Sequence, residues 1–243
     1  FTMDEGCSEA VKEVFVRLYD KGLIYRGNRM VNWCPHCNTS ISDAEVEYEE
    51  KDGSFWHLLY PVKETGEMLE LATTRPETML GDTAVAINGD DPRYAHLHGC
   101  HVILPLLNKE IPIVCDEHAD MTKGTGVVKI TPAHDPNDFE VGLRHDLPIV
   151  RVFTYDGRMT GAVDKAAADA LFAAGKNTVN EPHVLDCGKY AGMTTLEARK
   201  AILADLEAGG FLKETEPLKH EVGTCYRCHS TIEIGRASCR ERV

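Results

Sequence analysis

Two Cys-x-x-Cys pairs stand near opposite ends of this 243-residue chain, and they constrain its fold more than any other feature. The first pair is Cys34 and Cys37; the second, about 190 residues further on, is Cys225 and Cys228. Each pair has the spacing that places two thiolates on one tetrahedral metal ion, and two pairs complete a four-thiolate structural zinc site. Because one metal ion would join such distant segments, we expect the pairs to close the base of a large insertion.

Two other interpretations of these cysteines stay open. The four thiols could remain reduced without a metal, or the pairs could bind separate metals. The second pair, with His229, also matches the Cys-x-x-Cys-His pattern of covalent haem attachment, which needs an exported protein. Zinc binding uses thiolates, so a zinc site would weaken as the pH falls.

Composition favours a globular protein of the cytoplasm. The net charge of -13 argues against a surface that coats nucleic acid, although a local basic pocket could still receive one end of an RNA. No apolar run approaches the roughly 20 residues that span a bilayer, and the N-terminus has no export signal. The nine cysteines are therefore expected as thiols or metal ligands rather than disulfides.

Residues 124–138 change their periodicity midway. β-Branched residues predict a strand over residues 127–131. Asp135 followed by Pro136 predicts a helix start, because the Asp side chain accepts hydrogen bonds from unpaired amides and Pro at the first helical position gives up none. The segment therefore reads as a strand that runs into the N-terminus of a helix.

This strand–helix unit gathers reactive side chains. Lys129 and Thr131 share one face of the strand, while Asp135 and Asp138 stand at the helix start. One interpretation is a site with a cation, a hydroxyl and two carboxylates; the other is that the carboxylates only cap the helix. His134 could serve as a base, but we interpret it as structural.

A second polar motif, Thr-Thr-Arg-Pro-Glu-Thr, occupies residues 73–78. Thr73 and Arg75 share a face if the preceding strand continues, and Pro76 ends it. A guanidinium is the natural partner of a phosphate or a carboxylate, so the motif suits an anionic ligand. The alternative is a polar strand end with a solvated arginine.

The rest of the pattern predicts a mixed α/β fold. An amphipathic helix with a core-like face is expected over residues 2–19. Strands are expected at residues 23–26, 30–33, 55–60, 68–72, 83–87, 102–106, 111–115 and 149–153. Further helices are expected at residues 139–145, 163–174 and 195–208, the last two as outer-surface or docking helices. Residues 234–243 show neither periodicity nor a turn signal and are excluded as a cloning or assembly remnant.

The motifs at residues 73–78, 124–135 and 142–145, together with the cysteine pairs, resemble the class I valyl-tRNA synthetases, specifically the connective insertion that carries their editing domain. The resemblance covers about residues 1–233 and implies an α/β fold of the α+β type, with a β-rich editing domain between zinc-knuckle flanks. It places the end of the catalytic half with the first knuckle at residues 1–50 and the editing domain at residues 51–190. A return helix with the second knuckle follows at residues 191–233, and a non-native tail at residues 234–243.

The resemblance also implies residue roles. Asp138 would hold the α-ammonium of a misattached amino acid, a task that suits an acceptor-only carboxylate. The catalytic pocket would be formed by Lys129, Thr131, Asp135 and Asp138. The wall that meets the terminal adenosine and its phosphates would be formed by Thr73, Thr74, Arg75, Glu77 and Thr78. A structural zinc would be held by Cys34, Cys37, Cys225 and Cys228.

The implied function is hydrolysis of threonine from mischarged tRNA(Val). Threonine and valine are nearly isosteric, and a hydrophobic pocket rejects the added hydroxyl only about a hundredfold, an established value for valyl-tRNA synthetase. The implied partners are the acceptor end of tRNA(Val) and the rest of the synthetase chain, of which this monomeric chain would be a piece.

The sequence contains neither the HIGH nor the KMSKS signature of class I activation sites. We therefore expect no valine activation by this chain alone, with ATP and magnesium used only by the full-length parent. The alternative function is a module that binds the acceptor end without hydrolysing the ester.

Overall fold

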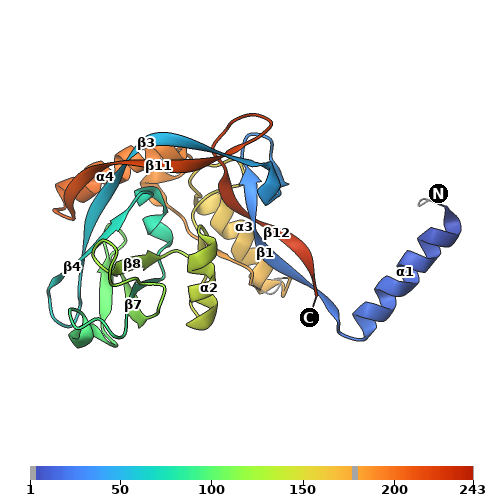
Figure 1. Cartoon of the computed structure of the whole chain (residues 1–243), viewed down its shortest axis with the longest axis horizontal. Coiled ribbons are helices and arrows are strands. Elements are labelled where there is room, and N and C mark those ends of the chain that lie inside the picture. Colours follow the sequence, from blue (N-terminus) through green and yellow to red (C-terminus); the bar gives the residue numbers. More distant parts are fainter. Residues whose placement is uncertain (1–3, 177–179, 243) are drawn as a thin grey trace.

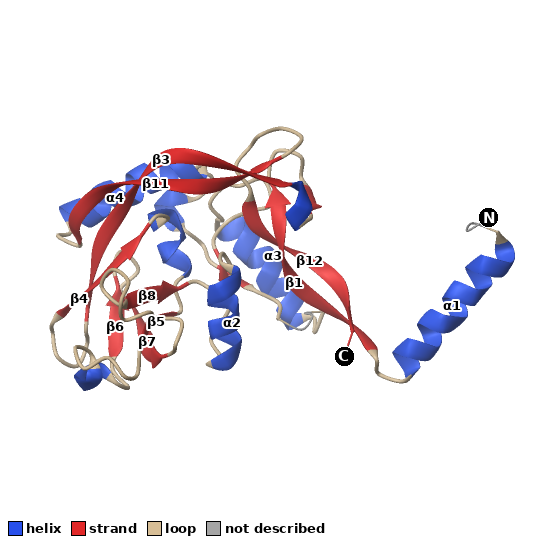
Figure 2. Ribbon diagram, in the orientation of Figure 1, coloured by secondary structure: helices blue, strands red, loops and turns tan. Residues whose placement is uncertain are grey.

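The computed structural model describes residues 4–176 and 180–242. Its strands form several small sheets, with α-helices placed around and between them (Figure 1). Figure 2 shows how much of the body is strand and how the first helix projects away from it. The expected mixed α/β, sheet-rich class is therefore confirmed.

The first sheet joins the two ends of the chain. Strand β1 (Ile24–Cys34) pairs antiparallel with β2 (Thr39–Ile41) on one side and with β12 (Glu233–Arg242) on the other. The expectation of two separate short strands in β1 was wrong. The backbone ladder with β12 continues through Gly27 and Asn28, because cross-strand hydrogen bonds outweigh the local turn preference of these residues.

Strand β12 includes C-terminal residues that the sequence analysis set aside. Residues 234–243 show no periodicity, and the backbone over Glu233–Arg242 is extended and paired along β1. Pairing along an existing strand needs backbone donors and acceptors rather than a hydrophobic period, so the pattern carried no signal. Residue 243 lies outside the described residues.

A long antiparallel ribbon links the first sheet to the body of the molecule. Strand β3 (Val46–Pro61) pairs with β11 (Leu212–Cys225) on one edge and with β4 (Met68–Thr73) on the other. At one end of the ribbon Cys225 lies opposite Val46, close to the first cysteine pair. The entry and exit segments of the intervening residues therefore run side by side.

A four-stranded sheet forms the centre of the body. Its order is β6 (His101–Leu104), β7 (Lys109–Cys115), β5 (Ala84–Ile87) and β8 (Val127–Ile130), with only β5 and β7 parallel. Helix α2 (Pro136–Arg144) follows β8 directly. The main core lies between this sheet and the ribbon, and includes the fully buried side chains Leu58, Tyr60, Leu71, Met79, Ile87 and Leu104.

The remaining elements cover one side of this core. Strands β9 (Val150–Arg151) and β10 (His183–Val184) form a short parallel pair next to helix α3 (Ala162–Ala173). Helix α4 (Thr195–Ala208) buries one apolar face in the core, so the expectation of an outer-surface helix was only partly right. Short 3-10 turns lie at Asp43–Glu45, Pro76–Gly81, Ala95–Leu97 and Gly188–Tyr190.

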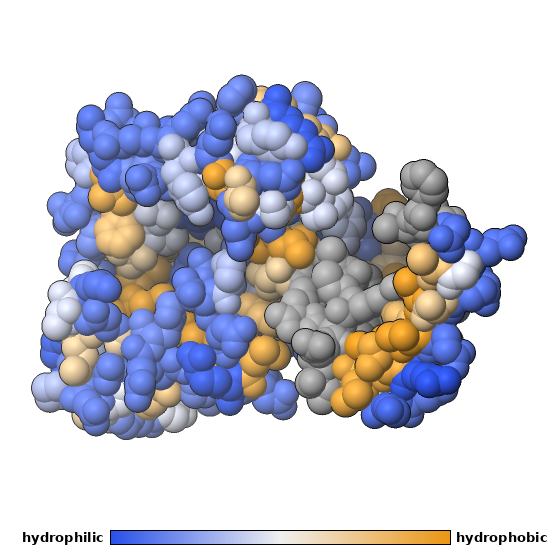
Figure 3. Space-filling view, turned by 45° about the vertical axis from the view of Figure 1, so that its right-hand side comes forward, coloured by the Kyte–Doolittle hydropathy of each residue, from blue (hydrophilic) through white to orange (hydrophobic). Residues whose placement is uncertain are grey.

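Helix α1 (Glu5–Asp20) corrects another expectation. It forms where the sequence predicted it and is capped by Asp4, but its apolar face is not part of a core. Val11 is 69% exposed, and an apolar stripe runs along the helix in Figure 3. Helical periodicity shows that one face of a helix is apolar, but it does not show that another element packs against that face. None of the described helices combines the length and apolarity needed to cross a membrane.

Candidate functional site

One cavity of about 260 Å³ brings together residues of the two polar motifs. Its walls come from the end of β4, from β8, from the start of α2 and from the loop before β8. Of the nine residues to which the sequence assigned a catalytic or binding role, eight line this cavity: Thr73, Thr74, Arg75, Thr78, Lys129, Thr131, Asp135 and Asp138. Residues more than 50 positions apart in the sequence thus share one site.

The strand–helix unit has the local structure that the sequence predicted. Asp135 is the N-cap of α2 and accepts hydrogen bonds from the amides of Asn137 (2.7 Å) and Asp138 (3.1 Å), while Pro136 occupies the first turn. The carboxylate of Asp138 accepts the backbone N–H of Thr131 at 2.9 Å. Asp135 therefore caps the helix, whereas Asp138 turns back to the strand end and faces the cavity.

Lys129 is the centre of a hydroxyl cluster. Its Nζ donates to the Thr78 hydroxyl at 2.9 Å and to the Thr131 hydroxyl at 2.5 Å, so strands and turns from both motifs are linked by one ammonium. Its side chain is only 11% exposed. The expected placement of Lys129 and Thr131 on a common face is confirmed.

A buried carboxylate that the sequence analysis missed lies beneath this cluster. Asp82 accepts hydrogen bonds from the hydroxyls of Thr131 (2.7 Å) and Tyr60 (2.8 Å), and its Oδ1 lies 3.4 Å from Nζ of Lys129. Burial raises the pKa of Asp82 to about 6, although Lys129 and both hydroxyls act in the opposite direction. The sequence carries no local signal for this role, because the burial of Asp82 depends on contacts between distant segments.

His118 is a second residue of the site that the sequence did not assign. Its Nε2 lies 3.6 Å from Oδ1 of Asp138, on the side of that carboxylate away from Thr131. The neighbouring Asp138 carboxylate raises the pKa of His118 against the opposing effect of burial. The sequence analysis could not connect His118 with the site, because its neighbour in space, Asp138, is 20 positions away.

Arg75 is held at the cavity wall by two carboxylates. Its guanidinium contacts Glu77 Oε1 at 3.2 Å and Glu233 Oε2, from the start of β12, at 2.5 Å. Burial lowers the pKa of Arg75, but the two carboxylates outweigh it and raise the pKa above its usual value. Arg75 therefore stays charged at the edge of the site.

Glu77 is the one assigned residue that does not line the cavity. Its side chain is 1% exposed and accepts two hydrogen bonds from Arg199 of α4, both at 2.8 Å, in addition to the contact with Arg75. Burial raises the pKa of Glu77, but Arg199 and Arg75 outweigh this effect and hold the pKa below its usual value. Glu77 thus lies behind the wall and joins Arg75 to α4.

His134 lines the cavity and is structural in its contacts, as expected. Its Nε2 accepts the backbone N–H of Val152 at 3.0 Å, and its ring packs edge-on against Phe153. Burial holds the pKa of His134 well below its usual value, so the ring is neutral. Because Nε2 accepts, Nδ1 carries the proton, and within the described residues it has no partner.

The four cysteines meet at the junction of the first sheet and the ribbon. Sulfur atoms of Cys34, Cys37, Cys225 and Cys228 all lie within 4.8 Å of one another, so the two pairs could hold one metal ion. The Cys37 amide donates to the Cys34 sulfur at 3.3 Å. Four sulfur donors at this spacing fit tetrahedral zinc with bonds of about 2.3 Å. His229 is 65% exposed and points to Glu47, outside this group.

Comparison with known proteins shows the family of this chain. A family model described as tRNA synthetases class I (I, L, M and V) matches residues 1–228. Because the match extends over most of the sequence, the chain belongs to the class I tRNA synthetases.

Within that class the chain is similar to a segment of valyl-tRNA synthetases. The valine–tRNA ligases of Treponema denticola, Clostridium perfringens and Carboxydothermus hydrogenoformans are 50%, 52% and 53% identical to it, each over 96% of this chain. The chain spans about a quarter (24%) of the length of these curated relatives. A solved complex of Agrobacterium radiobacter LeuRS with tRNA and LeuAMS matches with a TM-score of 0.45 and 17% identity, over 97% of this chain and 34% of that chain.

Proposed function

We propose that this chain is the editing part of a valine–tRNA ligase and hydrolyses the ester between threonine and tRNA(Val). The observation that carries this proposal is the shared cavity, which is lined by two cations, four threonines and two carboxylates drawn from the two distant motifs. A hydrolytic site for an aminoacyl ester needs an anchor for the ammonium, donors for the developing oxyanion and a position for water. The cavity offers residues of each type.

The ammonium of the threonyl group would bind Asp138. This carboxylate is fixed by the Thr131 amide through Oδ2, which leaves Oδ1 directed towards His118 and the cavity. A fixed carboxylate loses little conformational freedom on binding, so the ion pair contributes its full orienting effect. Asp135 would lie at the pocket wall as a helix cap rather than as a second anchor.

Lys129 would stabilise the negative charge that develops on the ester oxygen. Its ammonium lies in a largely buried site, where a preorganised charge acts more strongly than in water. The Thr131 hydroxyl donates its proton to Asp82, so its remaining lone-pair capacity faces Lys129 and the cavity, where it can accept from water. Asp82 and Tyr60 thus orient the polar cluster from behind.

The polar lining would also produce selectivity between threonine and valine. A bound threonine hydroxyl would pair with the hydroxyls or Lys129, whereas valine would leave these groups desolvated and unpaired. A site built to pair with a ligand hydroxyl strongly rejects an isostere that lacks the hydroxyl. An apolar site rejects an isostere that carries an added hydroxyl much less strongly. The preference for threonine would therefore come from the penalty on valine.

We also propose that the four cysteines hold a structural zinc ion. Its thiolate ligands would tie the β1–β2 turn to the end of β11 and so fix the base from which the ribbon extends. Zinc would supply only this cross-link, since the described cluster lies apart from the polar cavity.

The test is hydrolysis of threonyl-tRNA(Val) and valyl-tRNA(Val) by this chain at low and moderate salt. Selective release of threonine supports the proposal. Asp138→Asn keeps an acceptor for the Thr131 amide but loses the charge, so it should abolish most of the deacylation without unfolding the site. Asp169→Asn is the matched control, because Asp169 lies on the outer side of α3 and pairs with Lys165.

A second candidate function is a module that binds the acceptor end without hydrolysis. Its basis is the net charge of -13, because with few phosphate contacts at working salt this chain alone would hold the acceptor end too briefly for hydrolysis. Binding of the acceptor end without release of either amino acid, even at low salt, would support this function and contradict autonomous editing. Full activity of Asp138→Asn would contradict the role of Asp138.

A further inference from the structure

One titratable side chain of the cavity around Lys129 has no part in the reaction proposed above. His118 lines the cavity together with Asp138, and its Nε2 lies 3.6 Å from Oδ1 of that carboxylate. The side chain of His118 is 29% exposed, whereas that of Asp138 is 9% exposed. The imidazole is therefore the more accessible member of the pair, and solvent can exchange its proton.

The carboxylate of Asp138 needs a counter-charge at Oδ1. Its Oδ2 accepts the backbone N–H of Thr131 at 2.9 Å, which leaves Oδ1 for a second partner. A carboxylate in so buried a position is stable as an anion only when donors or cations lie beside it. Before a ligand binds, the protonated ring of His118 supplies that charge, and the Asp138 carboxylate in turn raises the pKa of His118.

The contact between the two side chains is a loose one. A separation of 3.6 Å is an ion-pair distance, but it is too long for a hydrogen bond. The ammonium of a ligand can approach the same oxygen to about 2.8 Å and donate to it directly. Because two cations beside one oxygen repel each other, the ammonium and the imidazolium of His118 compete for Oδ1 of Asp138.

The backbone beneath His118 is fixed by Asp116. The His118 amide donates to Oδ1 of Asp116 at 2.9 Å, and the same carboxylate contacts Arg144 at 2.8 Å and His145 at 2.9 Å, at the end of α2. Asp138 lies in the first turn of that helix. Both members of the pair are thus anchored to α2, so the imidazole can leave Oδ1 by side-chain rotation without movement of the loop.

The charged groups around His118 determine the sign of its titration. Asp138 and Asp135 approach from the start of α2, and Asp116 lies directly after the end of β7. These three carboxylates favour the protonated ring, whereas burial opposes it. The cavity is also lined by two side-chain cations, those of Arg75 and Lys129.

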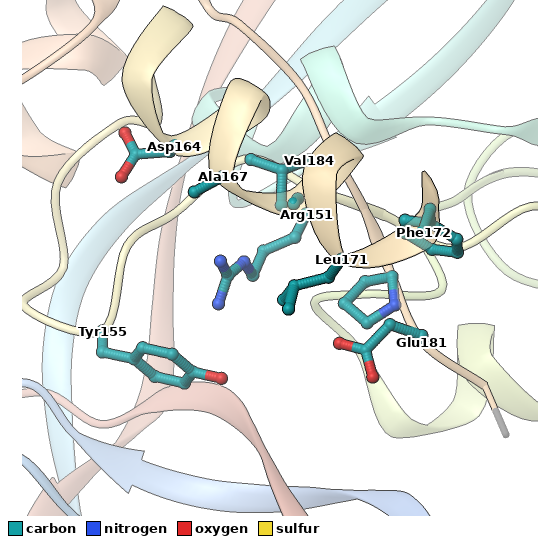
Figure 4. Close-up of a pocket in the computed structure, with 10 residues that line it drawn as sticks. Arg151, Tyr155, Asp164, Ala167, Leu171, Phe172, Glu181 and Val184 are labelled. Carbon is teal, nitrogen blue, oxygen red and sulfur yellow. The ribbon is translucent and has the colours of Figure 1, made fainter. Parts of the chain in front are cut away.

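Neither the second histidine of this cavity nor the second cavity offers the same exchange. Burial holds the pKa of His134 well below its usual value, and Nε2 of this neutral ring accepts the Val152 amide. A second cavity, of about 240 Å³, lies beside α3, and Figure 4 shows the guanidinium of Arg151 with Asp164 and Glu181 in its lining. Guanidinium groups do not lose a proton in proteins, so ligand binding there would not be linked to a proton on the cation.

We propose that His118 is a proton-linked positioning residue, whose imidazolium pairs with Oδ1 of Asp138 until the α-ammonium of a threonyl ester takes its place. This assignment rests on the proposed function, in which Asp138 anchors that ammonium. Binding of the ester releases one proton from His118 to water, because the neutral ring does not repel the ligand. Substrate binding is therefore weak in acid and becomes tighter as the pH rises and His118 loses its proton.

The first test is an NMR titration of the histidine rings of this chain. The ligand is 3′-threonylamino-3′-deoxyadenosine, in which an amide replaces the reactive ester. Binding of this analogue should lower the pKa of His118 by about 1 or more, because a second cation then lies beside the ring. Asp138→Asn should lower the pKa of His118 without any ligand. The His118 signal is assigned by its absence from His118→Gln.

The second test compares the pH dependence of threonyl-tRNA(Val) hydrolysis by the wild type and by His118→Gln. Glutamine keeps a donor near Asp138 but carries no charge at any pH. At about pH 5.5 the variant should therefore have a KM about tenfold lower than the wild type, while the two KM values converge near pH 8 and kcat changes little. A merely structural ring would instead give a variant with a higher KM or a lower kcat at every pH.

His96→Gln is the matched control, because His96 is exposed and contacts Glu67 outside the cavity. It should leave the KM at each pH unchanged.

Four outcomes would overturn the inference. The first two are a pKa of His118 that is unchanged in Asp138→Asn and one that is unchanged by the bound analogue. The others are no binding of the analogue by the wild type at millimolar concentration and a KM ratio between wild type and His118→Gln that is the same at every pH. Selective release of threonine without these effects contradicts only this inference, whereas proton-linked binding of the analogue without hydrolysis of the ester contradicts only the proposed function.

Discussion

The buried link between Glu77 and Arg199 makes a quantitative prediction about stability. Arg199 of α4 donates two hydrogen bonds of 2.8 Å to a carboxylate that is 1% exposed, and the only other cation on that carboxylate among the described residues is Arg75, at 3.2 Å. Arg199→Ala would leave a buried charge with half of its partners.

The magnitude follows from this geometry. Removing one member of a fully buried ion pair costs about 3–5 kcal/mol. Arg75 remains in contact with Glu77, and the Arg199 side chain is 28% exposed, so water can replace part of the lost contact. We therefore expect a loss of about 2–3 kcal/mol in the free energy of unfolding, with the largest share from the uncompensated carboxylate.

The assay is equilibrium urea unfolding followed by circular dichroism. With a denaturant slope near 3 kcal/mol/M, the midpoint should fall by roughly 0.7–1 M. Tryptophan fluorescence is unsuitable, because Arg199 itself lies over the Trp56 ring. Lys165→Ala, which breaks an exposed pair on α3, is the control and should cost no more than about 0.5 kcal/mol.

The pH dependence gives a second check on the same pair. The pKa of Glu77 is lowered in the folded state, so its contribution to stability is complete above the unfolded pKa of about 4.3 and is lost as the pH falls through the lower folded value. The difference between wild type and Arg199→Ala should therefore shrink in acid. A loss equal to that of Lys165→Ala, or one that does not change with pH, would refute the reasoning.

Two further predictions concern the polar cluster and the cysteines. Asp82→Asn should reduce deacylation strongly, because the amide would contact Lys129 and Thr131 without a negative charge. The pKa of Asp82 is raised from 3.8 to about 6 in the folded state. The free energy of unfolding of the wild type should therefore fall relative to that of Asp82→Asn as the pH rises from 4 to 6, as measured by paired urea titrations. Equal stability differences across that range would contradict the buried-carboxylate assignment. Metal analysis should find about one zinc ion per chain, bound more weakly in acid. A chelator or Cys225→Ser should remove the zinc and lower the urea midpoint of unfolding. Retention of zinc by Cys225→Ser would contradict the four-thiolate site.

The elements of the candidate site that the sequence predicted are those with local causes. The strand before Thr131 and the helix start at Asp135 depend on β-branching, a proline and a side-chain cap, all within a few residues. The cysteine spacing likewise predicted that two distant turns would meet, because a four-thiolate site has few other solutions. These features could be recognised without knowing any contact at a distance.

The features that escaped prediction depend on contacts between distant segments. Periodicity predicted α1, but whether its face is covered depends on what packs against it. No local pattern distinguishes Asp82, which is fully buried under Thr131, from a solvated aspartate. Likewise no local pattern shows that Glu77 lies behind the cavity wall while its neighbours in the sequence line the cavity. Likewise β12 is ordered by its pairing with β1.

The physical reason for this division is the range of the interactions involved. Capping, turn formation and strand propensity act between neighbours in the chain, so the residue types that surround Lys129 and Asp138 could be assigned from their order alone. Burial, desolvation and charge pairing act between groups that only folding brings together. The sequence therefore determined the strand that carries Lys129 and the helix start that carries Asp138, and the tertiary structure decided which polar groups face the cavity and which support it from behind.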